Sequence, residues 1–231
     1  MVPPTAGWTE KGHPQLQPRG VLRHSSNYLS PWIAVRMKTR VFIDFWNFQL
    51  SINDIDPAYR IDWRKVSPWL IGEASNIVGR SLSHEGTQVY MSYDPGNKKD
   101  SGLRDFALNV LGRFPGIQVS LLERKARNAP VCPSCHQPIE NCPHCGKLMT
   151  RTIEKGVDTA IVTDMLKLAW EGALEAGILV SSDRDFIPAV EVLSTKGYKV
   201  INAHFPPQGM HLARACWASI GLKNGLAHFQ R

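Results

Sequence analysis

The stretch from Ile178 to Phe186 constrains this chain more than any other, because it joins a buried strand to two acids. Three apolar residues lead into Ser181 and Ser182, and Asp183 and Asp185 follow. A short apolar run bounded in this way predicts a parallel strand that is buried on both faces. Open parallel sheets bind ligands outside the carboxyl ends of their strands, so the two acids are candidate ligands. An Asp before a helix is also an ordinary N-cap, and this stretch alone does not separate the two roles.

Apolar segments of strand length alternate with segments of helical periodicity along the rest of the chain. We predict strands at 40–45, 87–93, 117–122, 178–180 and 198–203. We predict helices at 62–77, 101–113, about 152–177, 186–196 and 210–219. Asp62 should cap the first of these helices and Pro68 should kink or shorten it, and a loop through Asp54, Asp56 and Pro57 is expected before it. The repeated alternation predicts an α/β fold whose parallel sheet is covered by helices on both faces.

The net charge of +7 is concentrated in two segments. Residues 1–40 carry six Lys or Arg against one acid, and residues 121–155 carry six against three. Clustered basic residues favour a polyanionic partner, although a basic tail is as often a solubilising appendage. The sequence shows no membrane-spanning apolar run and no signal-peptide pattern, so we expect a cytoplasmic protein.

Residues 1–36 hold five prolines scattered among Gly, Gln and Ser, without a periodic apolar pattern. We predict that this segment is a disordered or weakly ordered extension. Met37 lies directly before the first convincing strand and is a candidate for the true start. The functional domain is therefore expected at residues 37–231.

Between the third predicted strand and the long helix, at about 124–151, the chain carries a C-x2-C-x6-C-x2-C pattern. Its members are Cys132, Cys135, Cys142 and Cys145. Four thiolates match the closed tetrahedral shell of a structural Zn²⁺, and a cytoplasmic chain keeps its thiols reduced, which disfavours disulfides. His136 and His144 are not needed as ligands, and Cys216 is expected to be an inert core residue. Basic flanking residues make contact with nucleic acid conceivable, but a purely structural knuckle with solvated charges is equally consistent.

Two further acids extend the candidate site. Asp44 ends the first predicted strand, and Asp158 lies in the first turn of the long helix. Carboxylates crowded at one sheet edge repel one another and normally require a cation, and oxygen ligands suit Mg²⁺ or Mn²⁺. Asn47 can orient a ligand or a water without adding charge. Asp164 would point about 120° away from Asp158 around the helix and is a weaker candidate.

Three segments together resemble the motifs of the NYN domain, a PIN-like nuclease fold, in its LabA-like bacterial branch. They are Val41–Asn47, Lys155–Asp158 and Ser181–Pro188, and the resemblance covers roughly residues 38–205. It implies a Rossmann-like α/β sheet and metal-dependent cleavage of RNA. The acidic positions that it implies are Asp44, Asp158, Asp183 and Asp185, with Asn47 beside them. The cysteine insertion departs from the minimal domain and leaves substrate access open.

The leading functional hypothesis is an endoribonuclease in which one or two divalent ions activate water against an RNA phosphodiester, with single-stranded RNA as the expected partner. Lys155 or Arg184 could stabilise phosphate charge, and Trp46 could stack on a base or belong to the core. The alternative is a catalytically silent nucleic-acid-binding or adaptor module that recognises its target through the zinc knuckle. A metal-dependent phosphatase fits less well, and the missing G-x-G-x-x-G turn disfavours dinucleotide binding. The sequence leaves the oligomeric state open.

Overall fold

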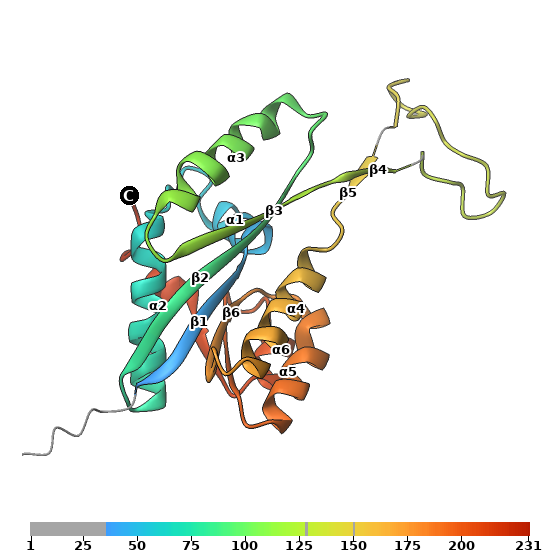
Figure 1. Ribbon diagram of the computed structural model, residues 1–231. Coiled ribbons are helices and arrows are strands. Elements are labelled where there is room, and N and C mark those ends of the chain that lie inside the picture. Colours follow the sequence, from blue (N-terminus) through green and yellow to red (C-terminus); the bar gives the residue numbers. More distant parts are fainter. Residues whose placement is uncertain (1–35, 128, 150) are drawn as a thin grey trace, which may run out of the picture. The chain divides into compact units, whose positions relative to one another are not determined.

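A computed structural model describes residues 36–127, 129–149 and 151–231, and its main feature is a six-stranded parallel sheet (Figure 1). The strands of this sheet are β1 (Met37–Asp44), β2 (Leu82–Tyr93), β3 (Ile117–Glu123), β6 (Ala176–Val180), β7 (Lys199–His204) and β8 (Ala218–Gly221). Two short strands, β4 (Lys125–Arg127) and β5 (Arg151–Ile153), form a separate antiparallel ribbon.

The order of the strands is β3-β2-β1-β6-β7-β8. The chain first adds strands outward from β1 to β3, and it then returns to place β6 on the free side of β1. The direction of winding therefore reverses between β1 and β6. In open parallel sheets such a switch point is where ligands bind, outside the carboxyl ends of the strands.

Helices cover both faces of the sheet. The bounds of the helices are α1 (Phe45–Ile55), α2 (Trp63–Val78), α3 (Lys98–Asn109), α4 (Val157–Trp170), α5 (Ile187–Thr195) and α6 (Met210–Ala215). Val41 and Ile43 of β1 belong to one core cluster with residues of α1, α2 and α3, whereas Phe42 belongs to a second cluster with α4, α5 and α6. This alternation is the period of a strand, and it confirms the predicted α/β fold with a parallel sheet covered on both faces.

The helix α1 was not predicted, because a loop was expected after the first strand. Asp44 ends β1 and caps α1 at once, so no turn residues separate the two elements. The buried residues Phe45, Phe48 and Ile52 have helical spacing, but their aromatic character resembles a continuation of the strand. Three short 3-10 helices, at Leu111–Arg113, Arg184–Phe186 and Leu222–Gly225, complete the described elements.

Several predicted bounds were wrong. The long helix runs over 157–170 instead of 152–177, because residues 151–153 pair with β4 and Gly172, with a φ of 65°, follows the last turn. The last predicted helix stops at Ala215, and 218–221 adds β8 to the sheet as a sixth strand. Asp62 caps α2 as expected, but the helix continues through Pro68 to Val78, so Pro68 does not shorten it.

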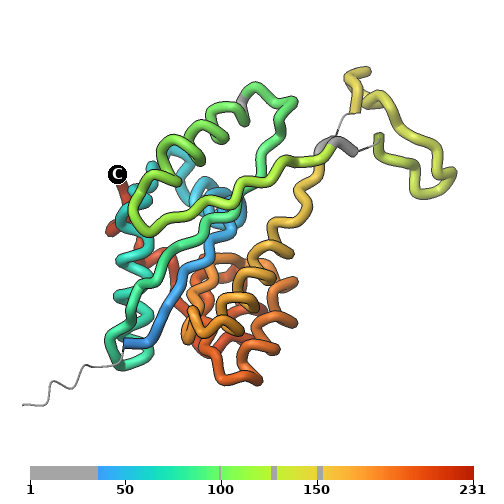
Figure 2. The backbone as a smooth tube through the Cα atoms, viewed as in Figure 1, coloured from blue at the N-terminus to red at the C-terminus, as the bar shows by residue number. Residues whose placement is uncertain are grey.

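The cysteine insertion is joined to the sheet through the β4–β5 ribbon, and Figure 2 shows the backbone path that leaves β3 and the path that enters α4 approaching each other there. Lys125 pairs with Ile153, and Arg127 pairs with Arg151. The insertion therefore begins and ends at neighbouring positions, and this brings the segment after β3 next to the segment before α4.

Two sequence predictions concern other parts of the chain. The predicted extension at 1–36 lies outside the described residues, except for Arg36. Within the described ranges, every helix is too short or too polar to span a lipid bilayer.

Gly209 offers a test of the packing that holds the end of β6 in place. It precedes α6 with a φ of 78°, and a Cβ added there would lie 2.9 Å from the Cβ of His204 and 3.1 Å from the Cα of Ser182. Gly197, with a φ of 85°, has open space around it and is the matched control. We expect Gly197→Ala to cost about 1–2 kcal/mol from backbone strain. Gly209→Ala should cost about 1–3 kcal/mol more from overpacking, measured by urea unfolding, and equal losses would contradict this packing.

Candidate functional site

Asp44 is the buried centre of the candidate site. Asp44 is 6% exposed. It lies two residues after Phe42 in β1, and so on the same face of the sheet, which α4 covers. Its Oδ1 accepts a hydrogen bond from the Asn47 backbone N–H at 3.2 Å, and its Oδ2 accepts one from the Ser181 hydroxyl at 3.2 Å. One carboxylate thus caps α1 and joins the carboxyl ends of β1 and β6.

A second set of bonds fixes the end of β6. The side-chain carbonyl of Asn47 accepts a hydrogen bond from the Ser182 backbone N–H at 2.9 Å. The Ser181 hydroxyl accepts one from the Asp183 N–H at 3.1 Å, and the Asn202 side-chain amide donates to the Ser181 carbonyl at 2.8 Å. Asn47 thus orients backbone at the site, and Asn202, which the sequence did not single out, supports the same turn from β7.

Asp183 and Asp185 follow β6 as predicted. Asp183 caps the 3-10 helix that begins at Arg184, because its Oδ1 accepts a hydrogen bond from the Asp185 N–H at 2.9 Å. Asp185 and Arg184 are exposed, and Asp183 is partly buried. The N-cap role is therefore real for Asp183, and its second carboxylate oxygen can still face a ligand.

Asp158 lies in the first turn of α4 and is exposed. Desolvation of its carboxyl group by the surrounding protein is the largest cause that raises its pKa, followed by the charges of Asp183, Glu154 and Asp185. The charges of three acids from two segments therefore act on one carboxylate. Asp183 and Asp185 therefore lie within electrostatic reach of Asp158, and a site shared by the four aspartates stays a prediction.

Glu154 is a member of the cluster that the sequence did not single out. Its Oε2 accepts a hydrogen bond from the Ser92 hydroxyl and lies 3.6 Å from Nη2 of Arg124. Its charge raises the pKa of both Asp44 and Asp158. Because Glu154 directly follows β5, its place depends on the pairing of the ribbon, which sequence periodicity did not reveal.

The pKa of Asp44 is raised to about 6. Burial is the largest cause, the hydrogen bonds from Asn47 and Ser181 oppose it, and the charges of Asp158 and Glu154 contribute to the rise. Repulsion among close carboxylates is relieved by a bound cation. The donors are all carboxylate oxygens, which suit Mg²⁺ or Mn²⁺.

No three His, Cys, Asp or Glu side chains within the described ranges converge closely enough to form a preassembled metal site. The five acids interact through their charges over a wider span. Mg²⁺ commonly keeps several waters and needs only one or two protein carboxylates. The donor set therefore fits a hydrated divalent ion better than a closed protein cage.

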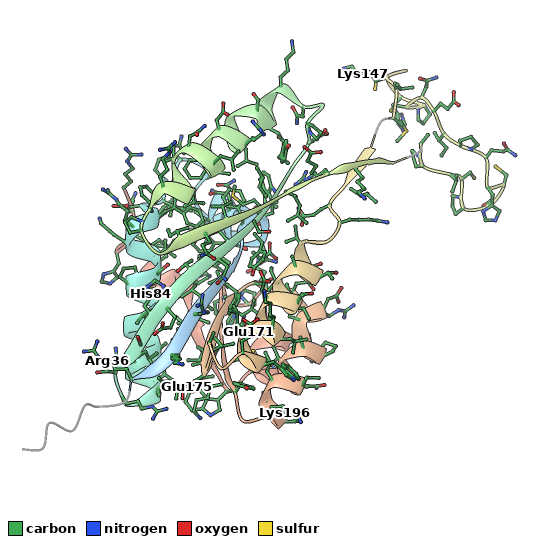
Figure 3. The ribbon with its side chains drawn as sticks, in the orientation of Figure 1. Arg36, His84, Lys147, Glu171, Glu175 and Lys196 are labelled. Carbon is green, nitrogen blue, oxygen red and sulfur yellow. The ribbon has the colours of Figure 1, made fainter. Side chains whose placement is uncertain are left out.

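Acids elsewhere on the surface differ from the cluster. Glu171 and Glu175, labelled in Figure 3, lie where β6 begins, at the opposite end from Asp183. Glu175 accepts a hydrogen bond from the Lys38 backbone N–H at 2.8 Å, and Glu171 lies 4.0 Å from the Lys167 ammonium. These two acids have local structural partners.

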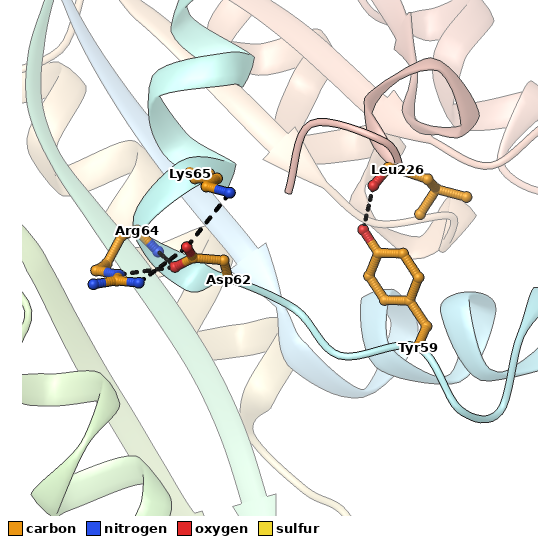
Figure 4. Close-up of polar contacts among 5 residues, drawn as sticks. All are labelled: Tyr59, Asp62, Arg64, Lys65 and Leu226. Atoms are coloured by element: carbon orange, nitrogen blue, oxygen red, sulfur yellow. Dashed lines mark hydrogen bonds and ion pairs between the residues drawn. The ribbon is translucent and has the colours of Figure 1, made fainter. Parts of the chain in front are cut away.

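Asp62 shows the usual effect of such a partner. Its carboxylate lies 2.9 Å from Nε of Arg64 and 3.8 Å from the ammonium of Lys65, and the nearby Tyr59 hydroxyl donates to the Leu226 carbonyl (Figure 4). Hydrogen bonding from Arg64 lowers the pKa of Asp62, which is the opposite direction to the shift of Asp44.

Of the remaining candidate residues from the sequence, two are exposed cations and one is a half-buried tryptophan. Lys155 is exposed beside Glu154, and Arg184 is exposed between Asp183 and Asp185. Trp46 is half-buried, and its indole N–H donates to the Ser92 carbonyl at 2.8 Å. Its place against the core favours the structural interpretation of this residue, and stacking on a base stays a prediction.

Asp164, the weaker candidate from the sequence, accepts a hydrogen bond from the buried Tyr90 hydroxyl at 2.7 Å. Cys216 is partly buried in the α6 region, and burial raises the pKa of its thiol to about 12. Both residues therefore have roles or environments outside the acid cluster.

The cysteine insertion contains two similar turns. The His136 N–H donates to the Cys132 carbonyl at 2.9 Å, and the Gly146 N–H donates to the Cys142 carbonyl at 2.8 Å. His136 and Gly146 both have positive φ, at 57° and 69°. Each C-x2-C pair is held in one turn, and its first thiol has a lowered pKa from nearby backbone hydrogen bonds. Since no group of three or more ligands is assembled among the described residues, a shared zinc site stays a prediction.

A cavity of about 690 Å³ lies on the α1–α3 face of the sheet. Its walls include Phe45, Trp46, Trp63 and Phe106, and none of the five acids lines it. The acids occupy the strand edge instead. The charge coupling and the switch point coincide at this edge, which is therefore the candidate site.

Comparison with known proteins agrees with this geometry. The family model for the NYN domain matches residues 38–220. The chain belongs to the NYN domain family. NYN domains have an α/β PIN-like fold and are generally nucleases that act on nucleic acid, typically with divalent metals. The strand edge described above is therefore the candidate active site of this NYN domain.

Two other comparisons add little about function. No curated protein matches the chain. A solved structure that matches is a protein of unknown function from Vibrio parahaemolyticus, with 16% identity and a TM-score of 0.48 over 85% of this chain and 97% of that one.

Asp44→Asn should stabilise the protein when divalent ions are chelated by EDTA. The pKa of Asp44 is about 6 in the fold against an ordinary value of 3.8, so the wild type loses stability as pH rises from about 4 to about 6. At pH 7 we expect the variant to gain about 1–3 kcal/mol, reduced by weakened hydrogen bonds. Urea unfolding at pH 4 and pH 7, with the exposed Asp54→Asn as control, measures the difference. A gain that does not change with pH would contradict the burial of an ionised Asp44.

Proposed function

We propose that this NYN domain is a divalent-metal-dependent endoribonuclease that acts on single-stranded RNA. The observation that carries the proposal is the coupling of Asp44, Asp158 and Asp183 with Asp185 and Glu154 at the switch point of the sheet. A cluster of acids in which Asp44 and Asp158 have raised pKa values suits a cation and an anionic phosphodiester at the carboxyl ends of the strands.

The acidic side chains would hold the ion. Bound Mg²⁺ or Mn²⁺ supplies Lewis-acid stabilisation of phosphate charge and lowers the pKa of a water. Asp44 is fixed by Asn47 and Ser181, so it presents its carboxylate in one orientation. Asp158 in the first turn of α4, with Asp183 and Asp185 after β6, would share the ion with solvent.

The exposed cations would bind the substrate. Lys155 precedes α4 and Arg184 follows Asp183, so both can reach a phosphate held at the acids. Water attack on phosphorus with release of the 3′-oxygen would leave a 5′-phosphate and a 3′-hydroxyl. The open edge suits an extended single strand, whose backbone can cross it without the width of a duplex.

Asp183→Asn should reduce cleavage of single-stranded RNA in Mn²⁺ by about a hundredfold or more. The substitution removes one negative charge while retaining an oxygen that can cap the 3-10 helix. Asp54→Asn, on the exposed end of α1, is the matched control and should cleave as the wild type does. Product ends and DNA substrates are analysed in the same gel assay. Equal activity of Asp183→Asn and wild type, or full activity in EDTA, would refute the proposal.

A catalytically silent nucleic-acid-binding module is the second candidate. It is favoured by one observation, that no three ligands within the described ranges are preassembled around an ion position. Tight RNA binding without turnover at any Mn²⁺ concentration, lost in Cys132→Ser, would support this candidate over the nuclease.

We also propose that Cys132, Cys135, Cys142 and Cys145 bind one structural Zn²⁺. The two similar turns each present a thiol pair, and four thiolates complete a tetrahedral shell. Freshly purified protein should contain about one zinc per chain by elemental analysis. Cys132→Ser should lose most of it, whereas Cys216→Ser should keep it. Less than about half an equivalent in the wild type would contradict a four-cysteine site.

A further inference from the structure

The base of the β4–β5 ribbon carries an ion pair that adjoins the acid cluster. The register pairs Lys125 with Ile153, so Arg124 and Glu154 are the next residues across the ribbon. Their side chains meet, with Nη2 of Arg124 3.6 Å from Oε2 of Glu154. Closing the ribbon therefore brings these two charges together.

Arg124 is held by three further contacts. Its backbone N–H donates to the Tyr93 carbonyl at 2.7 Å, and its Nε donates to the Ser92 hydroxyl at 3.0 Å. Its guanidinium lies over the Trp46 ring, 5.0 Å from the centroid. The planar guanidinium has little freedom in this arrangement, because one face is covered and its edge is bonded.

Glu154 connects this arrangement to the site. The Ser92 hydroxyl and Arg124 both bind Oε2, so among the contacts of the described residues Oε1 is the oxygen left for another ligand. Ser92 lies two residues beyond Tyr90, which pairs with Asp44 in the β1–β2 register. The hydrogen bond from Ser92 therefore holds Glu154 at the sheet edge that carries Asp44, and the negative charge of Glu154 acts on both Asp44 and Asp158.

We propose that Glu154 is an additional oxygen ligand of the cation site, and that the cysteine insertion places it there through Arg124. This inference rests on the proposed function, because it assumes a divalent ion at the acid cluster. It assigns the insertion a task within the site: β5 leads directly into Glu154, and β4 follows directly on Arg124. Arg124 acts as a positioning residue.

The test is Mn²⁺ binding by isothermal titration calorimetry, on the full zinc-loaded chain without RNA. Glu154→Gln should weaken Mn²⁺ binding about tenfold, since it removes a charged ligand and keeps the shape. Glu171→Gln is the matched control, because Glu171 lies beyond α4 in an exposed pair with Lys167. It should bind Mn²⁺ as the wild type does. Circular dichroism confirms that both variants fold.

Arg124→Lys tests the positioning role, because it keeps the charge but loses the planar contacts to Trp46 and Ser92. We expect Mn²⁺ binding to weaken about threefold in the wild-type background and not at all in the Glu154→Gln background. Because the insertion acts through Glu154, Cys132→Ser should likewise weaken Mn²⁺ binding in the wild-type background and leave it unchanged in the Glu154→Gln background. Cys216→Ser should not change Mn²⁺ binding in either background. Additive losses in the double variants would overturn the positioning role.

The outcomes separate this inference from the proposed function. Mn²⁺ binding to the wild type with equal affinities for Glu154→Gln and Glu171→Gln would overturn the role of Glu154 and leave the nuclease proposal intact. A wild type that binds no Mn²⁺ would overturn both.

Discussion

The structure of the candidate site depends on one buried carboxylate. Asp44 joins β1, the start of α1 and the end of β6 through its two oxygens. These bonds fix its position but do not remove the cost of its charge, because burial and neighbouring acids still raise its pKa. The fold therefore holds an acid in a place where ionisation is unfavourable unless a cation compensates it. Such a compromise between stability and chemistry is typical of functional sites.

The base of the cysteine insertion adds to the negative charge around Asp44. The ribbon that closes it ends at Arg124 and Glu154, and Glu154 adds a further negative charge near Asp44 and Asp158. Arg124 offsets part of that charge and limits the motion of Glu154. The insertion can thus contribute to the edge of the sheet through the residues at its base.

The predictions from sequence succeeded where a local pattern has one structural meaning. The short apolar run at Ile178–Val180 predicted a buried strand, and it belongs to β6. Asp183 and Asp185 therefore follow the carboxyl end of a strand, as predicted. Where patterns were ambiguous, the predictions failed. Aromatic residues after Asp44 look like strand but form α1, and 218–221 looks like helix but pairs with β7. Pairing with β7 decided 218–221, and Asp44 starts α1 without intervening turn residues, so residue periodicity alone reveals neither outcome.

Sequence patterns predicted the α/β class and singled out the four aspartates and the cysteine pattern, because strand ends, helix starts and C-x2-C turns are local features. The reversal of winding between β1 and β6, and the effect of Glu154 on the aspartates, were visible only in the folded chain. The same holds for the role of Asn47, whose side chain binds the backbone of Ser182 far along the chain. The physical reason is that strand order and charge coupling depend on distances in space, which a chain sets only when it folds.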